Sequence, residues 1–139
     1  MSGSGEPDDP RRALTAGARR FEGRVAVVTG GTTGIGLAIV QRLHAEGATV
    51  VFCGRRPGVG AEALATLDSA APNPAEFVTA DVTHRDQLVA LHATAVDHHG
   101  RLDVLVNNAG NVVVGPLLKL KPEHWRRTIA LNLDSAFDS

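Results

Sequence analysis

The stretch TGGTTGIG, residues 29–36, decides the fold. It follows an apolar, β-branched run at residues 25–29, which is typical of a strand covered on both faces by helices. Beyond it, apolar residues recur at helical spacing from Ile35 to Leu43, and Gly47 ends that pattern as a C-terminal cap does. A glycine-rich turn between a buried strand and a helix predicts the first half of a βαβ unit.

The glycines of this turn predict a phosphate-binding site. The first turn of a helix leaves backbone N–H groups without partners, and its dipole favours a nearby anion by about 0.3–1 kcal/mol. Gly30 suits the tight turn, Gly34 lets a ligand approach the backbone, and Gly36 lets the helix pack near the strand. We therefore expect a pyrophosphate at this turn.

Two other nucleotide-binding classes fit the turn less well. The phosphate loop of nucleoside triphosphatases needs Gly-Lys followed by Ser or Thr, but the first lysine of this chain is Lys119. A methyltransferase usually carries an acidic residue at the end of the first strand, where this chain has Thr29. Both classes are set aside.

The rest of the chain repeats the alternation of short apolar runs and amphipathic segments. Further strands are expected at residues 49–53, 76–80 and 103–107. Helices are expected at about residues 61–70, from a capping box at Thr83 and Asp86 to Gly100, and from Pro122 onward. The last helix carries an apolar stripe of Trp125, Ile129, Leu133 and Phe137. The order predicts an α/β fold, a three-layer, doubly wound parallel sheet of the Rossmann type, truncated after the fourth strand and its helix.

The chain divides into a tail and one domain. Residues 1–20 mix Gly, Ser, Pro and paired charges without a repeating apolar face, so we expect a disordered N-terminal tail. Residues 21–139 are long enough for one domain of the usual ~100–200 residues and too short for two.

The composition excludes several classes of partner. Lys and Arg number 14 against 15 Asp and Glu, the formal net charge is -1, and no long basic run exists, so we expect no nucleic acid partner. No stretch approaches the ~20 apolar residues that span a bilayer, so we expect no membrane partner. The single cysteine, Cys53, forms no internal disulfide, which favours the cytoplasm. The 6 histidines show no ligand spacing, so we expect no metal.

Three further motifs follow the glycine turn. They are Asp81-Val82 after the third strand, Asn107-Asn108-Ala109-Gly110 after the fourth, and Leu131-Asn132-Leu133 in the last helix. With TGGTTGIG they make the chain resemble the short-chain dehydrogenase/reductase family over about residues 21–137. The resemblance implies an NAD(P)-dependent oxidoreductase that transfers hydride between a nicotinamide dinucleotide and a small-molecule carbonyl or alcohol substrate. Residues 21–139 would be part of its dinucleotide-binding domain.

The resemblance also implies roles for single residues. The diphosphate side would contact Gly30, Thr32, Thr33, Gly34, Ile35 and Gly36. Asp81 would accept a hydrogen bond from the adenine amino group, and Val82 would pack on the ring. The ribose and nicotinamide would lie against Asn108, Ala109 and Gly110, while Asn107 would tie its strand to the neighbours. Asn132 matches the family's catalytic, proton-relay asparagine.

Each assignment has a plainer alternative. Asp81 could cap the following helix, Asn132 could be a buried polar residue satisfied by the backbone, and residues 107–110 could be a chain reversal only. These alternatives predict different hydrogen-bond partners for the same side chains.

The end of the second strand bears on the choice of cofactor. An Asp or Glu there accepts from the adenosine ribose 2′-hydroxyl and favours NAD. This chain has Cys53-Gly54-Arg55-Arg56, and guanidinium suits a 2′-phosphate, with charge-assisted bonds of about 1.5–3 kcal/mol each. We therefore predict NADP(H), bound by Arg55 with Arg56 as a second contact. NAD bound without an acidic partner is the alternative.

The family's proton donor is absent from this sequence. A Tyr-x-x-x-Lys motif would follow a fifth strand, but the chain has no tyrosine, and its only lysines, Lys119 and Lys121, precede the last helix. We expect the chain to be the cofactor-binding N-terminal part of an oxidoreductase, inactive by itself. A non-catalytic dinucleotide-binding module or a protein-interaction module is the alternative.

Ending after the fourth strand and its helix also predicts exposed apolar surface. The fourth strand becomes an unpaired edge, and the last helix leaves its apolar stripe uncovered. We expect marginal stability, aggregation and self-association into a homo-oligomer.

Overall fold

Strand β1 (Val25–Val28) occupies an inner position of a four-stranded sheet. The other strands are β2 (Thr49–Gly54), β3 (Ala75–Thr79) and β4 (Val104–Val106), in the order β3-β2-β1-β4. Every pair is parallel. The computed structural model describes residues 19–139, and in them the predicted parallel sheet is confirmed.

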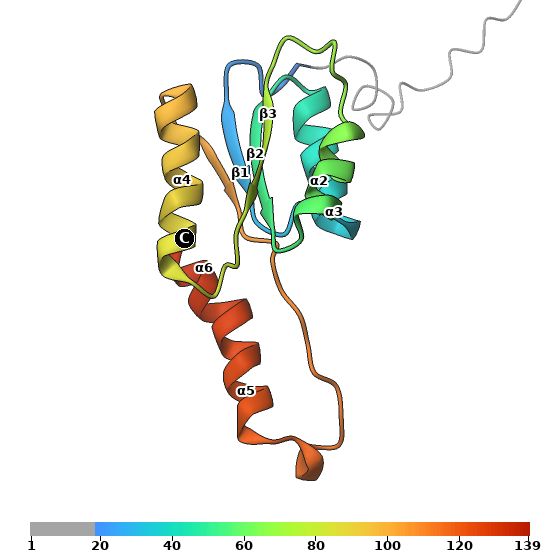
Figure 1. Cartoon of the computed structure of the whole chain (residues 1–139), viewed down its shortest axis with the longest axis vertical. Helices are drawn as coiled ribbons and strands as arrows, with labels where there is room; N and C mark the ends of the chain where they lie inside the picture. Colours follow the sequence, from blue (N-terminus) through green and yellow to red (C-terminus); the bar gives the residue numbers. More distant parts are fainter. Residues whose placement is uncertain (1–18) are drawn as a thin grey trace, which may run out of the picture.

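Helices cover both faces of this sheet, which makes three layers. Helices α2 (Gly34–Ala45) and α3 (Pro57–Ala65) lie on one face, and α4 (Arg85–His99) lies on the other (Figure 1). After β4 the chain forms a 3-10 turn η1 (Leu117–Lys119), helix α5 (Pro122–Ile129), a π-helical turn η2 (Ala130–Asp134) and helix α6 (Ser135–Asp138). The Rossmann-like α/β architecture expected from the sequence is therefore present.

Alternate residues of β1 enter two separate apolar cores. Val27 belongs to a buried cluster with Leu88 and Leu91 of α4. Val28 belongs to a second cluster with Val40 of α2 on the opposite face. Because successive side chains of a strand point to opposite faces, a strand between two helical layers must be apolar throughout.

The start of the described chain is fastened to the end of α2. The predicted tail, residues 1–20, lies outside the described residues except for Arg19 and Arg20. Arg20 donates from Nε and Nη2 to the two carboxylate oxygens of Glu46, each at 2.5 Å. The hydrogen bond from Arg20 is the main cause that lowers the pKa of Glu46 to about 2, with help from Arg42 and against the effect of burial. Arg20 thus belongs to the packed structure rather than to a tail.

Two local predictions are wrong. Helix α3 starts at Pro57 rather than near Ala61, because proline fits the first helical turn, where its missing N–H costs nothing. The predicted capping box at Thr83 does not form, because the N-cap residue of α4 is His84, whose side chain makes no capping hydrogen bond. Thr83 bonds to Asp81 instead, as short polar side chains do in turns.

The C-terminal arm, residues 107–139, is the least covered part of the fold. It extends away from the sheet through η1 and returns along α5, so that α6 lies beside α4 (Figure 1). No residue of α5 is buried, and the stripe residues Trp125, Leu133 and Phe137 are 69%, 60% and 86% exposed. Within residues 19–139, no helix combines the length and apolar character that crossing a membrane requires.

Candidate functional site

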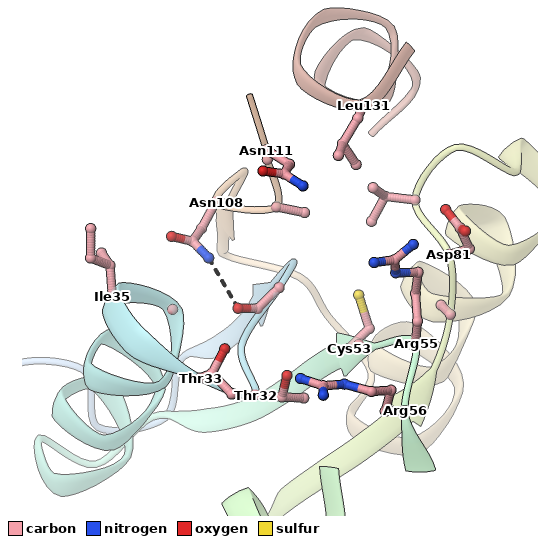
Figure 2. A pocket seen from close by; sticks show the side chains of 17 residues that line it. Thr32, Thr33, Ile35, Cys53, Arg55, Arg56, Asp81, Asn108, Asn111 and Leu131 are labelled. Atoms are coloured by element: carbon pink, nitrogen blue, oxygen red, sulfur yellow. Dashed lines mark hydrogen bonds between the residues drawn. The ribbon is translucent and has the colours of Figure 1, made fainter. Parts of the chain in front are cut away.

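A pocket of about 410 Å³ opens at the carboxyl ends of the strands. It is lined by the turn after β1, the end of β2, residues 80–82, residues 108–111 and Leu131 (Figure 2). All the residues predicted to bind the cofactor line it except Gly34. Segments far apart in the sequence therefore meet at the place where open α/β sheets bind ligands.

The glycine turn is built around two close approaches. A Cβ at Gly36 would overlap the carbonyl oxygen of Gly30 and Nδ2 of Asn108. Gly30 has a φ of 65°, and a Cβ there would lie 2.9 Å from Cα of Ala109. Only glycine fits both positions, so no side chain covers the backbone at Gly30 and Gly36.

Gly34 has a different reason to be glycine from the one predicted. It does not line the pocket, and a Cβ there would meet nothing within 4 Å. Its φ of 54°, at the first residue of α2, is a left-handed conformation that other residues rarely adopt. Its contact with a cofactor remains a prediction.

Asn108 fastens the end of β4 to the glycine turn. Its Nδ2 donates to the carbonyl oxygens of Thr29 and Gly30, both at 3.1 Å. Figure 2 draws the second of these bonds. Its backbone N–H and that of Ala109 both donate to Oγ1 of Thr29, at 3.1 Å. The sequence analysis assigned this role to Asn107, which is exposed. Successive side chains of an extended chain point in opposite directions, so Asn108 rather than Asn107 faces the turn.

Asp81 presents one free carboxylate oxygen beside the pocket. Its Oδ1 accepts from the Thr83 N–H at 3.0 Å and from the Thr83 hydroxyl at 2.7 Å. Burial acts to raise the pKa of Asp81, but the hydrogen bonds from Thr83 and the charges of Arg55 and His84 outweigh it and lower that pKa. Since His84 caps α4, the alternative that Asp81 caps the helix is wrong.

Arg55 and Arg56 place two positive charges at the end of β2. Both side chains are exposed, line the pocket and project into it, Arg55 toward Asp81 and Arg56 toward Thr32 (Figure 2). Among the described residues, no carboxylate lies within ion-pair distance of either guanidinium. The pocket thus holds two cationic side chains that form no ion pair within the described residues, although the charge of Arg55 acts on Asp81.

Asn132 contacts the pocket only through its neighbours. It lies in η2, and its Nδ2 donates to the carbonyl oxygens of Asn111 at 2.7 Å and Thr128 at 2.9 Å. A Cβ at Gly110 would lie 2.6 Å from Asn132 Oδ1, so this side chain needs a glycine opposite it. The amide is satisfied by backbone, as one alternative stated, but the residue is exposed rather than buried.

Five lining residues have no role in the sequence-based interpretation: Cys53, Gly54, Ala80, Asn111 and Leu131. Gly54 is the clearest of them, because a Cβ there would lie 2.6 Å from Cγ2 of Thr32. Burial raises the pKa of the Cys53 thiol, so it is a poor nucleophile. Four of the five adjoin a predicted residue in sequence, and Cys53 lies two residues before Arg55, which is the signal that could have identified them.

Comparison with known proteins agrees with this geometry. The family model described as short chain dehydrogenase matches residues 24–139. The chain belongs to the short-chain dehydrogenase family. No group of three or more His, Cys, Asp or Glu side chains that could hold a metal ion occurs among the residues described.

Individual relatives cover most of this chain. A 3beta-hydroxysteroid dehydrogenase from Mediterraneibacter gnavus is 40% identical over 119 residues, which are 85% of this chain and 43% of that protein. An NADP-dependent (R)-specific alcohol dehydrogenase from Lentilactobacillus kefiri is 37% identical over 85% of this chain and 46% of its own length. The crystal structure of a short chain dehydrogenase from Mycobacterium smegmatis superposes with a TM-score of 0.83 at 34% identity, over 88% of this chain and 51% of that one. The chain thus spans less than half the length of the two sequence relatives.

Proposed function

We propose that this chain forms the NADP(H)-binding part of a short-chain dehydrogenase that exchanges hydride between NADP(H) and a small-molecule carbonyl or alcohol. The observation that carries the proposal is the pair of guanidinium groups, Arg55 and Arg56, which lie in the pocket at the end of β2 and form no ion pair among the described residues. A guanidinium group forms bidentate, charge-assisted hydrogen bonds with a 2′-phosphate, and it gains no comparable binding energy from a ribose hydroxyl. NAD binding is the alternative.

The remaining lining residues fit the rest of a dinucleotide. The backbone N–H groups of the glycine turn stand at the start of α2, where an anionic diphosphate is favoured. Asp81 has a free oxygen to accept from the adenine amino group, beside Val82 for the ring face. Ala109 and Gly110 border the far end of the pocket, where the ribose and nicotinamide belong in this proposal.

When bound, a nicotinamide dinucleotide supplies the hydride donor or acceptor. The chain's own contribution at that end is Asn132, which holds the Asn111 carbonyl and which we propose as part of the proton relay. The sequence contains no tyrosine to exchange a proton with a substrate oxygen. We therefore propose that these 139 residues bind the cofactor but do not turn over substrate by themselves.

A titration of the purified chain with NADPH and with NADH, followed by cofactor fluorescence, tests the proposal. We expect NADPH to bind more tightly, and Arg55→Ala to weaken NADPH about tenfold or more, since one charge-assisted hydrogen bond contributes about 1.5–3 kcal/mol. Arg56→Ala should weaken it less, and NADH binding should change little. Arg127→Ala removes an equal charge from the exposed arm and serves as the control.

Equal affinity for the two cofactors, or unchanged NADPH affinity in Arg55→Ala, would refute the NADP(H) proposal. Absence of binding to either cofactor would favour the protein-interaction module. One observation supports that second candidate, namely the row of exposed apolar residues on the arm, with Leu117 and Leu118 at 83% and 99% exposure. Assignment to the cytoplasm stays a proposal that rests on the single, free cysteine.

A further inference from the structure

The helix that carries Asn132 contains one turn that is wider than an α-helical turn. In η2 the N–H of Ser135 donates to the carbonyl oxygen of Ala130, five residues earlier. In a regular α-helix the same N–H would bond to Leu131, four residues earlier. The Leu131 carbonyl therefore loses its expected backbone donor.

The hydroxyl of Ser135 takes the place of that donor. Its Oγ donates to the Leu131 carbonyl oxygen at 2.6 Å, and Ser135 is only 6% exposed, which excludes water as a ready substitute. Thr94 in α4 makes a bond of the same kind to Ala90 at 3.0 Å, but in a regular α-helix and at a half-buried position. The Thr94 hydroxyl therefore adds a bond to a carbonyl in a regular helix, whereas the Ser135 hydroxyl replaces a missing backbone donor.

The wide turn sets two directions that matter for the pocket. Leu131 reaches the pocket wall and packs on the core cluster of α4. Asn132, the next residue, points to the Asn111 carbonyl. The 2.7 Å ion pair of Arg85 with Asp138 holds helix α6 to α4. With α6 fixed in this way, a change from the π-helical to the α-helical turn would rotate residues 131 and 132 by about 100° around the helix axis.

We propose that Ser135 is a positioning residue, whose hydroxyl stabilises the π-helical turn that presents Leu131 and Asn132 to the nicotinamide end of the pocket. The role assigned to that end rests on the proposed function, whereas the bond pattern of the turn does not. Short π-helical turns inside α-helices are frequent at functional sites, and this one needs a side chain to satisfy its freed carbonyl.

The test uses the full chain as wild type, Ser135→Ala, Ser135→Thr and the control Thr94→Ala. Solution NMR measures the scalar coupling across the hydrogen bond from the amide nitrogen of residue 135 to its acceptor carbonyl carbon. Titrations measure the affinity for NADPH and for 2′,5′-ADP, which has the adenine end of the cofactor but no nicotinamide.

In wild type, Ser135→Thr and Thr94→Ala, we expect the coupling to run to Ala130. In Ser135→Ala we expect the coupling to run to Leu131. We expect this variant to bind NADPH about five- to tenfold more weakly, which is the change that one lost hydrogen bond produces. Its affinity for 2′,5′-ADP should equal that of wild type. A coupling to Ala130 in Ser135→Ala, or equal weakening of both ligands, would overturn the proposal. If wild type binds neither ligand, the proposed function fails and the coupling alone decides the role of Ser135.

Discussion

Strand β1 and helix α5 both carry a clear apolar pattern, but their surroundings are opposite. Every residue of β1 is buried, because α4 covers one face of the sheet and α2 the other. No residue of α5 is buried. Periodicity identifies the apolar face of an element, whereas burial also needs a partner within reach. The sheet body, residues 24–106, should therefore respond strongly to substitution, and the C-terminal arm weakly.

The largest contrast is expected between two leucines. Leu88 of α4 is fully buried and Leu118 of η1 is 99% exposed. Leu88→Ala should lower the free energy of unfolding by about 2–5 kcal/mol, since it removes transfer energy and leaves a cavity. Leu118→Ala should change it by less than about 0.5 kcal/mol. Urea denaturation followed by circular dichroism measures both, and equal losses would show that the arm is packed in solution.

A second contrast uses two glycines within the sheet body. Gly36→Ala forces a methyl group into the Gly30 carbonyl, so we expect a loss of about 1–3 kcal/mol in unfolding free energy together with loss of NADPH binding. Gly58 in α3 has open space around its Cβ position, and Gly58→Ala should stabilise by up to about 1 kcal/mol. Thermal melts and NADPH titration check the pair, and a harmless Gly36→Ala would contradict the close-packed turn.

The link between Arg20 and Glu46 should appear in the acid part of the stability profile. The pKa of Glu46 is lowered from 4.5 to about 2, so its contribution is complete above pH 4.5 and is lost as the pH falls toward 2. Glu46→Gln should therefore flatten the fall in urea midpoint over this range. Glu62→Gln, at an exposed position of α3, is the matched control and should follow wild type.

The smallest effect is expected at Trp125, the only tryptophan of the chain. Because it is 69% exposed, its emission should shift little on unfolding, and Trp125→Ala should leave the urea midpoint within error. Emission that moves to shorter wavelength with rising protein concentration would support the predicted self-association through the arm. A large red shift on unfolding of the dilute chain would contradict the exposed arm.

Much of the sheet body could be predicted from its sequence. The four strands, their order along the chain and the glycine turn all follow from local patterns of apolar and small residues. The start of α3 at Pro57 and the bonds of Thr83 were missed, because short polar or proline-containing turns have several nearly equal local solutions. The strand register decides whether Asn107 or Asn108 ties β4 to the turn, because a shift of one residue turns each side chain to the opposite face.

The sequence by itself determined the family motifs and the layered α/β fold, since these depend on residue type and spacing. Only the tertiary structure decided what each side chain is bonded to. It showed that Asp81 keeps one carboxylate oxygen free, that Arg55 faces the pocket without an ion pair to any described residue, and that Ser135 completes a π-helical turn. These features arise where segments distant in the sequence meet, and their contacts depend on packing geometry that no local pattern encodes.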